Sequence, residues 1–267
     1  HNLPYLEAIE ASLLGIPILI HGVWGVKYLF TAKANSYNGG GKKPHLPEYG
    51  RNRAYTWQRI TSWILLFGLI GHVVKFRFLD YPLTLNQGKE SYYFVRVDLD
   101  NGLYTVADRL GVTLYDTRAI QKEQAELETR QGEQALVEVS KGFSESQILD
   151  PHKEVIFLSA QKYTQKEAFV RKLENLSLQP GQVVAVVQNF GTASLLAVRN
   201  TFKSPIYAGL YTVFVLAACF HAFNGLWTFL ITWGILLKMA AQKAAVRWCV
   251  ALMLAIAFLG LLRTHGR

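Results

Sequence analysis

The sequence predicts an all-α bundle of transmembrane helices, with four spans, interrupted by a small inserted α+β domain. Hydrophobic residues make up 51% of the 267 residues, which is enough for a helical bundle and one additional domain. Long apolar stretches lie towards both ends of the chain, and a long charged stretch separates them. The expected domains are residues 1–86 with spans one and two, residues 87–203 as the insert, and residues 204–267 with spans three and four.

Four apolar stretches are free of charged residues, and each predicts one span. They are Ala11–Val26, Ile60–Val74, Ser204–Leu237 and Trp248–Leu262. Crossing the hydrocarbon core takes about 20 residues, so three of these stretches are short. Basic residues at their ends can lengthen a span, because a long basic side chain reaches from the apolar region to the interface. We therefore expect four transmembrane helices.

Basic residues concentrate in two of the connections between spans. The first connection contains a single acid, Glu48, and a run of bases: Lys27, Lys33, Lys42, Lys43, Arg51, Arg53 and Arg59. The last connection, residues 238–247, contains bases and no acid. The positive-inside rule places both connections in the cytoplasm and the insert on the outer side. Because topology explains the net charge of +9, we expect a membrane protein and no nucleic-acid partner.

The insert has its own pattern of short strands and helices. The alternation over Ser91–Leu99 predicts a strand, and helical spacing predicts helices over Thr117–Ser140 and Gln165–Leu176. Short apolar runs predict two further strands, Glu154–Ser159 and Val183–Val187, and a helix over Thr192–Thr201 follows a turn. These elements indicate a small α+β domain. It contains no clustered acids, no Ser/His/Asp set and no metal-binding spacing, so the sequence predicts no catalytic site in it.

Three histidines lie inside or at the edge of apolar stretches, and each has a glycine one helical turn away on the same face. The pairs are His21 with Gly25, His72 with Gly68, and His221 with Gly225. An ionisable residue at membrane depth is costly and therefore a candidate for function. Imidazole is a standard axial ligand of haem iron, and a glycine beside it leaves room for a flat ligand. The pattern predicts bis-histidine haem sites; packing residues or a proton path are the alternatives.

Three longer motifs contain these histidines. They read H-x-x-x-G-x-x-x-x-F-T-A-K from His21, Q-R-x-T-(x)10-H from Gln58, and F-H-x-x-N-G-L-W-x-F-x-x-T-W-G from Phe220. In these motifs the chain resembles the cytochrome b558 membrane subunit of bacterial succinate dehydrogenase, a single-polypeptide anchor with two haems. The resemblance extends over all four spans and leaves out the insert.

The resemblance implies which histidines share an iron. The family's anchor has five helices, with one ligating histidine on each of the first four. His21, His72 and His221 match the ligands of the second, third and fourth helices. His21 and His221 would therefore share one haem b, and His72 would share the other with a histidine on a first helix that this chain lacks. We expect one firmly held haem and a second, incomplete site.

The resemblance also implies a function. The chain would anchor the flavoprotein and iron–sulphur subunits to the bacterial inner membrane and pass electrons from the iron–sulphur subunit through haem to quinone. This role belongs to the respiratory chain and the tricarboxylic acid cycle, and the dicarboxylate chemistry would lie on the flavoprotein. Two alternatives remain. One is another quinone-linked b-type cytochrome subunit, and the other is a haem-free anchor or transporter whose histidines relay protons.

Four charged residues complete the set of candidates. Arg59 and Lys238, at the inner edge of the membrane, are candidates for pairing with haem propionates, although basic residues are common at interfaces. Quinone reduction consumes protons, so Glu10 and Glu7 at the outer end of span one are candidates for a quinone site. The alternative for both acids is a favourable charge at the start of a helix.

Overall fold

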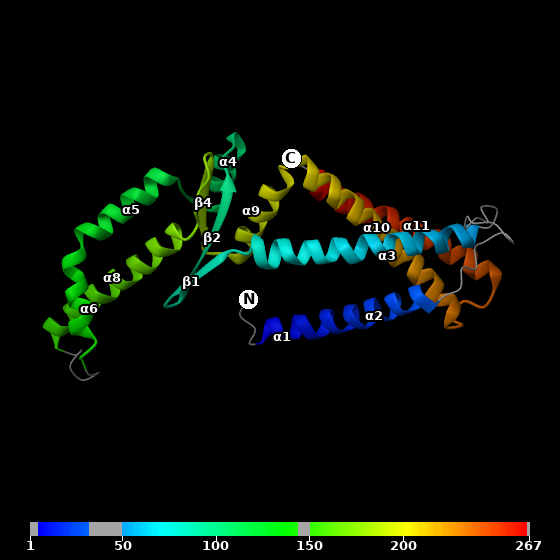
Figure 1. Cartoon of the computed structure of the whole chain (residues 1–267), viewed down its shortest axis with the longest axis horizontal. Coiled ribbons are helices and arrows are strands. Elements are labelled where there is room, and N and C mark those ends of the chain that lie inside the picture. The colour runs from blue at the N-terminus through cyan, green and yellow to red at the C-terminus, as the bar shows by residue number, and fades with distance from the viewer. Residues whose placement is uncertain (1–4, 32–49, 144–149, 266–267) are drawn as a thin grey trace. The chain divides into compact units, whose positions relative to one another are not determined.

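The structure is a computed structural model that describes residues 5–31, 50–143 and 150–265, and it consists of two compact units. His1–Val74 and Ser204–Arg267 form one unit, and Lys75–Lys203 form the other. Figure 1 shows only helices in the first unit and a sheet with helices in the second. We call them the helical unit and the inserted unit. The described residues are thus mostly helical, with one small sheet.

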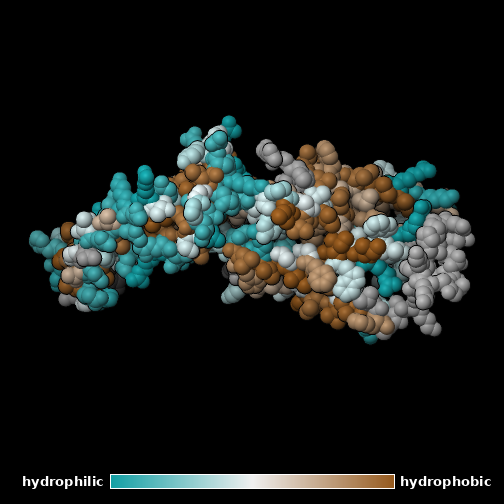
Figure 2. Space-filling model, turned by 45° about the horizontal axis from the view of Figure 1, so that its top comes forward, coloured by the Kyte–Doolittle hydropathy of each residue, from teal (hydrophilic) through white to brown (hydrophobic). Residues whose placement is uncertain are grey.

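The helical unit is built from four long helices. The first comprises α1 (Leu6–Glu10), a π-helical turn η1 (Ala11–Gly15) and α2 (Ile16–Thr31). The second is α3 (Gly50–Val73), which continues beyond Val74 into the inserted unit as the π-helical η2 (Val74–Leu79). The others are α10 (Pro205–Thr232) and α11 (Met239–His265). Within the described residues, four helices are long and apolar enough to cross a membrane: Ala8–Tyr28, Arg53–Leu79, Pro205–Thr232 and Met239–Leu262. This confirms the expected number of apolar helices. Many of their large hydrophobic side chains are exposed, and Figure 2 shows hydrophobic residues gathered over this unit on the face drawn.

The wide turn in the first helix has a local cause in the sequence. Pro17 follows it closely and has no backbone N–H, so the carbonyl of Leu13 cannot receive the usual helical hydrogen bond. The π-helical turn over Ala11–Gly15 lies where this bond is lost and lets the helix continue past the proline.

Helix α10 packs against both α3 and α11. Small residues bring these helices together, since Ala217 and Cys219 of α10 are buried and α11 carries Gly260 against Val215. The first helix differs: every residue of α1, η1 and α2 whose exposure the structure describes is exposed, apart from Leu6 and Gly22, which are half-buried. Little protein surface therefore covers α2.

The inserted unit contains a four-stranded antiparallel sheet in the order β1-β2-β4-β3. Its strands are β1 (Leu83–Gln87), β2 (Glu90–Asp98), β3 (Thr113–Tyr115) and β4 (Gln182–Val187). Its helices are α4 (Asn101–Leu110), α5 (Thr117–Thr129), the short η3 (Gln131–Glu133), α6 (Gln134–Ser140), α8 (Pro151–Glu174) and α9 (Phe190–Phe202). Strand β1 begins shortly before residue 87, where the sequence placed the start of the insert.

Apolar side chains cover both faces of the sheet. On one face, Val95, Val97 and Val183 form a core with Leu103 of α4 and Leu196 of α9. The other face contains Phe94, Val184 and Val186, with Ile120 of α5 and Leu173 of α8. The alternation of β2 and β4 thus places side chains in two cores, as expected for a strand covered on both sides.

Helix α4 and strand β3 were not predicted from the sequence, and two of the predicted elements differ from the structure. The predicted strand Glu154–Ser159 is wrong, because these residues lie inside α8. Asp150 caps this helix, Pro151 occupies its first turn, and buried positions recur at helical spacing from Ala160 onwards. The single helix predicted over Thr117–Ser140 is divided into α5 and α6 at the short helix Gln131–Glu133. The predicted strands at 91–99 and 183–187 and helices at 165–176 and 192–201 are present.

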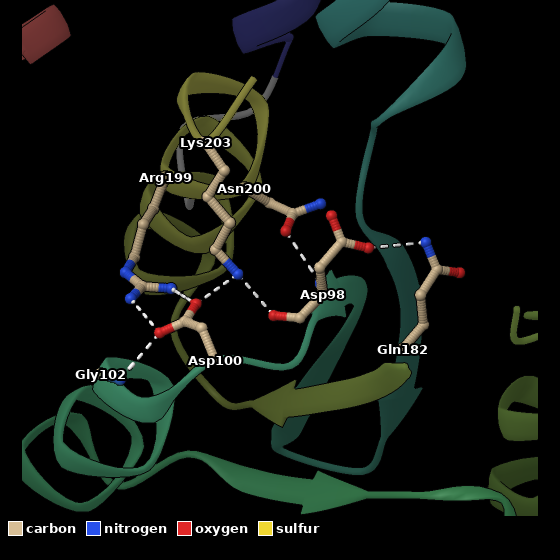
Figure 3. Close-up of polar contacts among 7 residues, drawn as sticks. All are labelled: Asp98, Asp100, Gly102, Gln182, Arg199, Asn200 and Lys203. Carbon is tan, nitrogen blue, oxygen red and sulfur yellow. Dashed lines mark hydrogen bonds and ion pairs between the residues drawn. The ribbon is translucent and has the colours of Figure 1, made fainter. Parts of the chain in front are cut away.

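A network of polar side chains joins α9 to the end of β2 (Figure 3). The Asp100 carboxylate accepts one hydrogen bond from each terminal nitrogen of Arg199, both at 2.8 Å, and pairs with Lys203. It also caps α4 by accepting from the Gly102 N–H at 2.8 Å. These bonds from Arg199 and Lys203 hold the pKa of Asp100 well below its usual range. Nearby, the Asn200 side chain accepts from the Asp98 N–H at 2.8 Å.

The two ends of the inserted unit are bonded to each other. Asp80, which follows η2, forms an ion pair with Lys75 at 2.6 Å. The buried Thr201 hydroxyl, near the end of α9, lies 3.0 Å from the Ala197 carbonyl oxygen in its own helix and 3.4 Å from the same Asp80 carboxylate, so its one hydrogen is shared between them. The points at which the chain enters and leaves this unit therefore lie close together.

Candidate functional site

Two of the three membrane histidines face each other within the helical unit. His21 lies on α2 and His221 on α10, and their ring centres are 6.1 Å apart. The ring planes are nearly perpendicular, at 88°. His221 is half-buried, whereas His21 is exposed, in keeping with the exposure of α2 as a whole. The structure therefore brings together His21 and His221, two residues that are 200 positions apart in the sequence.

A threonine on α3 contacts the ring of His221. Thr61 is 5% exposed, and its Oγ1 lies 3.3 Å from His221 Nδ1. The same hydroxyl has two backbone acceptors in its own helix, the Trp57 carbonyl oxygen at 2.8 Å and the Gln58 carbonyl oxygen at 3.2 Å. This contact joins α3 to the histidine pair.

A second side chain of α3 holds the backbone near His221. Gln58 Nε2 donates to the His221 carbonyl oxygen at 3.1 Å. Its Oε1 accepts from Asn224 Nδ2 at 2.8 Å. Gln58 thus bridges two points on α10, one at the histidine and one a helical turn further along.

The glycines beside this pair leave their helix surfaces open. A methyl group added at Gly25 would meet nothing within 4 Å, and one added at Gly225 would meet only Gln58 Nε2 at 3.6 Å. These are the two glycines that the sequence paired with His21 and His221. A side chain as small as a methyl group would therefore fit at both positions without a clash.

The distance between the two ring centres can be compared with the distance expected for two imidazoles that bind the same metal ion. Imidazole nitrogen binds first-row metals at about 2 Å, so two ligands on opposite sides of one iron place their nitrogens about 4 Å apart. Each ring centre lies roughly 1 Å behind its nitrogen, which gives a separation of about 6 Å. The observed 6.1 Å agrees with this value. Among the described residues there is no group of three or more His, Cys, Asp or Glu that could hold a metal ion.

His72 has different surroundings. It lies near the end of α3, and its Nδ1 is 3.1 Å from the Tyr211 hydroxyl. Its ring stacks on Phe214 with centres 6.2 Å apart. The same Phe214 ring fills the space beside Gly68, where an added methyl group would overlap it. A flat ligand at Gly68 would require Phe214 to move, so this position lacks the open surface found at Gly25 and Gly225.

The remaining candidates lie on several elements. Arg59, half-buried on α3, places its guanidinium 5.9 Å from the centre of the Tyr55 ring. Lys238 is exposed between α10 and α11, and Glu10 is exposed at the end of α1. The Glu7 side chain lies outside the part of the molecule that the structure describes.

Sequence reasoning quoted Gln58, Thr61 and Asn224 within the motifs but gave them no role. All three are polar residues in or beside apolar helices, and two of them, Gln58 and Thr61, are three residues apart, on one helix face. A pair of polar residues at this spacing in an apolar helix was the feature of the sequence that could have identified Gln58 and Thr61 as functional. Their partner on α10 could not be identified before α3 and α10 were placed together.

One curated protein is similar to part of this chain. The succinate dehydrogenase cytochrome b558 subunit of Bacillus subtilis (strain 168) is 37% identical over 62 residues, which is 23% of this chain and 31% of that protein. The similarity thus spans about a third of the relative's length. No protein-family model and no solved structure matches the chain.

Proposed function

We propose that this chain is a membrane-anchor cytochrome b subunit of a succinate dehydrogenase or fumarate reductase, and that His21 and His221 are the axial ligands of one haem b. The observation that carries the proposal is the 6.1 Å separation of their rings. The partial similarity to the cytochrome b558 subunit supports the same assignment.

The residues around the pair would bind and orient the haem. Haem b supplies one-electron redox chemistry, whereas the protein supplies the ligands, the burial and the hydrogen bonds that adjust the potential. His21 and His221 would hold the iron, and Gly25 and Gly225 would leave room for the porphyrin. Arg59 and Lys238 are proposed partners for the propionates, as a cation pairs with a carboxylate near the membrane surface.

His72 is proposed as the ligand of a second haem, next to Gly68, with its other ligand supplied from outside the described residues. In the present arrangement Phe214 occupies the space beside Gly68, so binding would require that ring to rotate. The second haem is therefore expected to bind more weakly than the first.

The proposed electron donor is the iron–sulphur subunit, which would bind together with the flavoprotein on the cytoplasmic side. The proposed acceptor is a quinone near the opposite membrane surface. Glu10, and Glu7 beside it in sequence, would supply protons there, because quinone reduction consumes them. This part of the proposal rests on the position of Glu10 at the exposed start of the first helix.

A reduced-minus-oxidised absorption spectrum of the full chain in membranes tests the proposal. We expect the bands of a b-type haem, and we expect His21→Ala and His221→Ala each to remove at least half of the haem per chain. His152→Ala is the matched control, because this exposed histidine lies on α8 of the inserted unit.

The outcome separates the proposal from a haem-free anchor or a transporter whose histidines relay protons. A chain that inserts into membranes but shows no haem bands in any preparation would contradict the proposal. Haem content that persists unchanged in both His21→Ala and His221→Ala would show that other residues bind it.

A further inference from the structure

We infer that Thr61, together with Gln58 and Asn224, is a positioning set that holds His221 with its proton on Nδ1 and leaves Nε2 available as the ligating nitrogen. This inference rests on the proposed function, because it assigns the orientation of one of the two proposed ligands. It gives a role to the three polar motif residues that the histidine pair leaves unexplained.

The direction of the bond between Thr61 and His221 follows from counting hydrogens. A threonine hydroxyl has one hydrogen to donate, and Thr61 Oγ1 lies 2.8 Å from the Trp57 carbonyl oxygen, which can only accept. With that hydrogen used in the helix, the hydroxyl oxygen can only accept at its other contact. His221 Nδ1, 3.3 Å away, must then donate. In a neutral imidazole with Nδ1 protonated, Nε2 carries the free lone pair.

The surroundings keep this arrangement in place. Thr61 is buried at 5% exposure, so water has little access to compete for either of its hydrogen bonds. A β-branched side chain in a helix has few rotamers, and the bond to the i−4 carbonyl selects among them. The acceptor for His221 is therefore fixed before any ligand binds.

Gln58 and Asn224 hold the backbone to which this imidazole is attached. Gln58 Nε2 donates to the His221 carbonyl oxygen at 3.1 Å, and Asn224 Nδ2 donates to Gln58 Oε1 at 2.8 Å. One side chain of α3 thus fixes the rotation of α10 about its axis at His221, while Thr61 fixes the rotation of the ring. Hydrogen bonds from the non-ligating ring nitrogen, such as the one from His221 Nδ1 to Thr61, orient metal-ligating histidines in proteins and increase their basicity.

The first test measures the protonated nitrogen directly, in the full chain without haem. We would label histidine with ¹⁵N, record NMR spectra in lipid, and assign His221 by its loss in His221→Gln. The wild-type chain should show Nδ1–H. Thr61→Val, which has the same shape but no hydroxyl, should show at least a tenfold shift of population away from Nδ1–H, and Thr61→Ser should restore it.

Thr228 provides a matched control. Its hydroxyl lies within hydrogen-bond distance of the carbonyl oxygens at i−4 and i−3, Asn224 and Gly225, as the Thr61 hydroxyl does on α3. Among the described residues, no imidazole forms a hydrogen bond with it. Thr228→Val should leave the His221 tautomer unchanged. If Thr61→Val does not accumulate in membranes, Thr61→Ala tests the same loss of the hydroxyl with a smaller side chain.

The second test uses the haem-loaded chain and a readout other than activity. The electron paramagnetic resonance signal of a low-spin iron depends on the angle between the two imidazole planes, here 88°. Thr61→Val should shift and broaden this signal and raise the haem potential, because the ligand becomes less basic. Thr228→Val should do neither.

The results of the two tests distinguish the inference from the proposed function. A wild-type chain with the proton on Nε2, or a Thr61→Val chain with an unchanged tautomer, would overturn the inference even if haem binds. Absence of haem together with a wild-type Nδ1–H tautomer that Thr61→Val loses would overturn the proposed function and keep the positioning set.

Discussion

Asp100 shows how one residue fixes the inserted unit. Its carboxylate receives two bonds from Arg199 and one from the Gly102 N–H, and these connect α9, the end of β2 and the first turn of α4 (Figure 3). A bidentate arginine–carboxylate pair has a defined geometry as well as charge. Asp100→Asn keeps the shape but loses the charge, so we expect it to destabilise the unit by about 1–3 kcal/mol. Thermal unfolding followed by circular dichroism measures the change.

The same residue predicts a pH dependence. The pKa of Asp100 is lowered in the folded state by Arg199 and Lys203. The stabilisation is therefore complete above the unfolded-state value of about 4 and decreases as the pH falls further towards the folded-state value. We expect unfolding of the wild-type unit to become easier below about pH 4, and Asp100→Asn to flatten this dependence. An equal slope in wild type and variant would show that other carboxylates cause it.

At the level of helices, the contact between α3 and α10 depends on Gly68. A methyl group added there would overlap the ring of Phe214, whereas one added at Gly71, one turn further along α3, would meet nothing within 4 Å. Gly68→Ala should therefore weaken the packing by about 1–3 kcal/mol, and Gly71→Ala should not. The free energy of unfolding of the membrane-inserted chain, measured for both variants, tests this prediction. Recovery of stability in the double variant Gly68→Ala with Phe214→Leu would identify the ring as the cause.

Some of the helices and strands could be predicted from the sequence alone. Strands β2 and β4 were predicted because their residues alternate or form a short apolar run, and the membrane helices because each contains an apolar stretch free of charged residues. Glu154–Ser159 was wrong because six apolar-rich residues fit a strand and a helix equally, and the deciding features, the Asp150 cap and the buried positions beyond Ala160, lie outside that window. The contact of Thr61 with His221 depends on tertiary packing, which no local pattern records.

For the whole molecule, charge predicts the topology. Acidic and basic residues balance within Lys75–Lys203, so the net charge of +9 falls on the remainder of the chain. We expect a cysteine introduced at exposed Lys141 to react with a membrane-impermeant reagent added outside the cell, and one at Lys243 to react only after the membrane is opened. Both native cysteines, Cys219 and Cys249, are buried and should stay unlabelled. Labelling of the Lys141→Cys chain from the cytoplasm alone would contradict the predicted topology and show that the insert lies on the cytoplasmic side.

The contact between Thr201 and Asp80 has a consequence for conformational entropy. A long segment placed between two packed helices acts as a loop whose ends must be held together, and the cost of closing a flexible loop grows with its length. Here the segment brings its own ends together through Asp80 and Thr201, and its two apolar cores supply the free energy of ordering it. Helices α3 and α10 are then joined as if by a short link. The insert is therefore expected to cost the flanking helices little stability, despite its length.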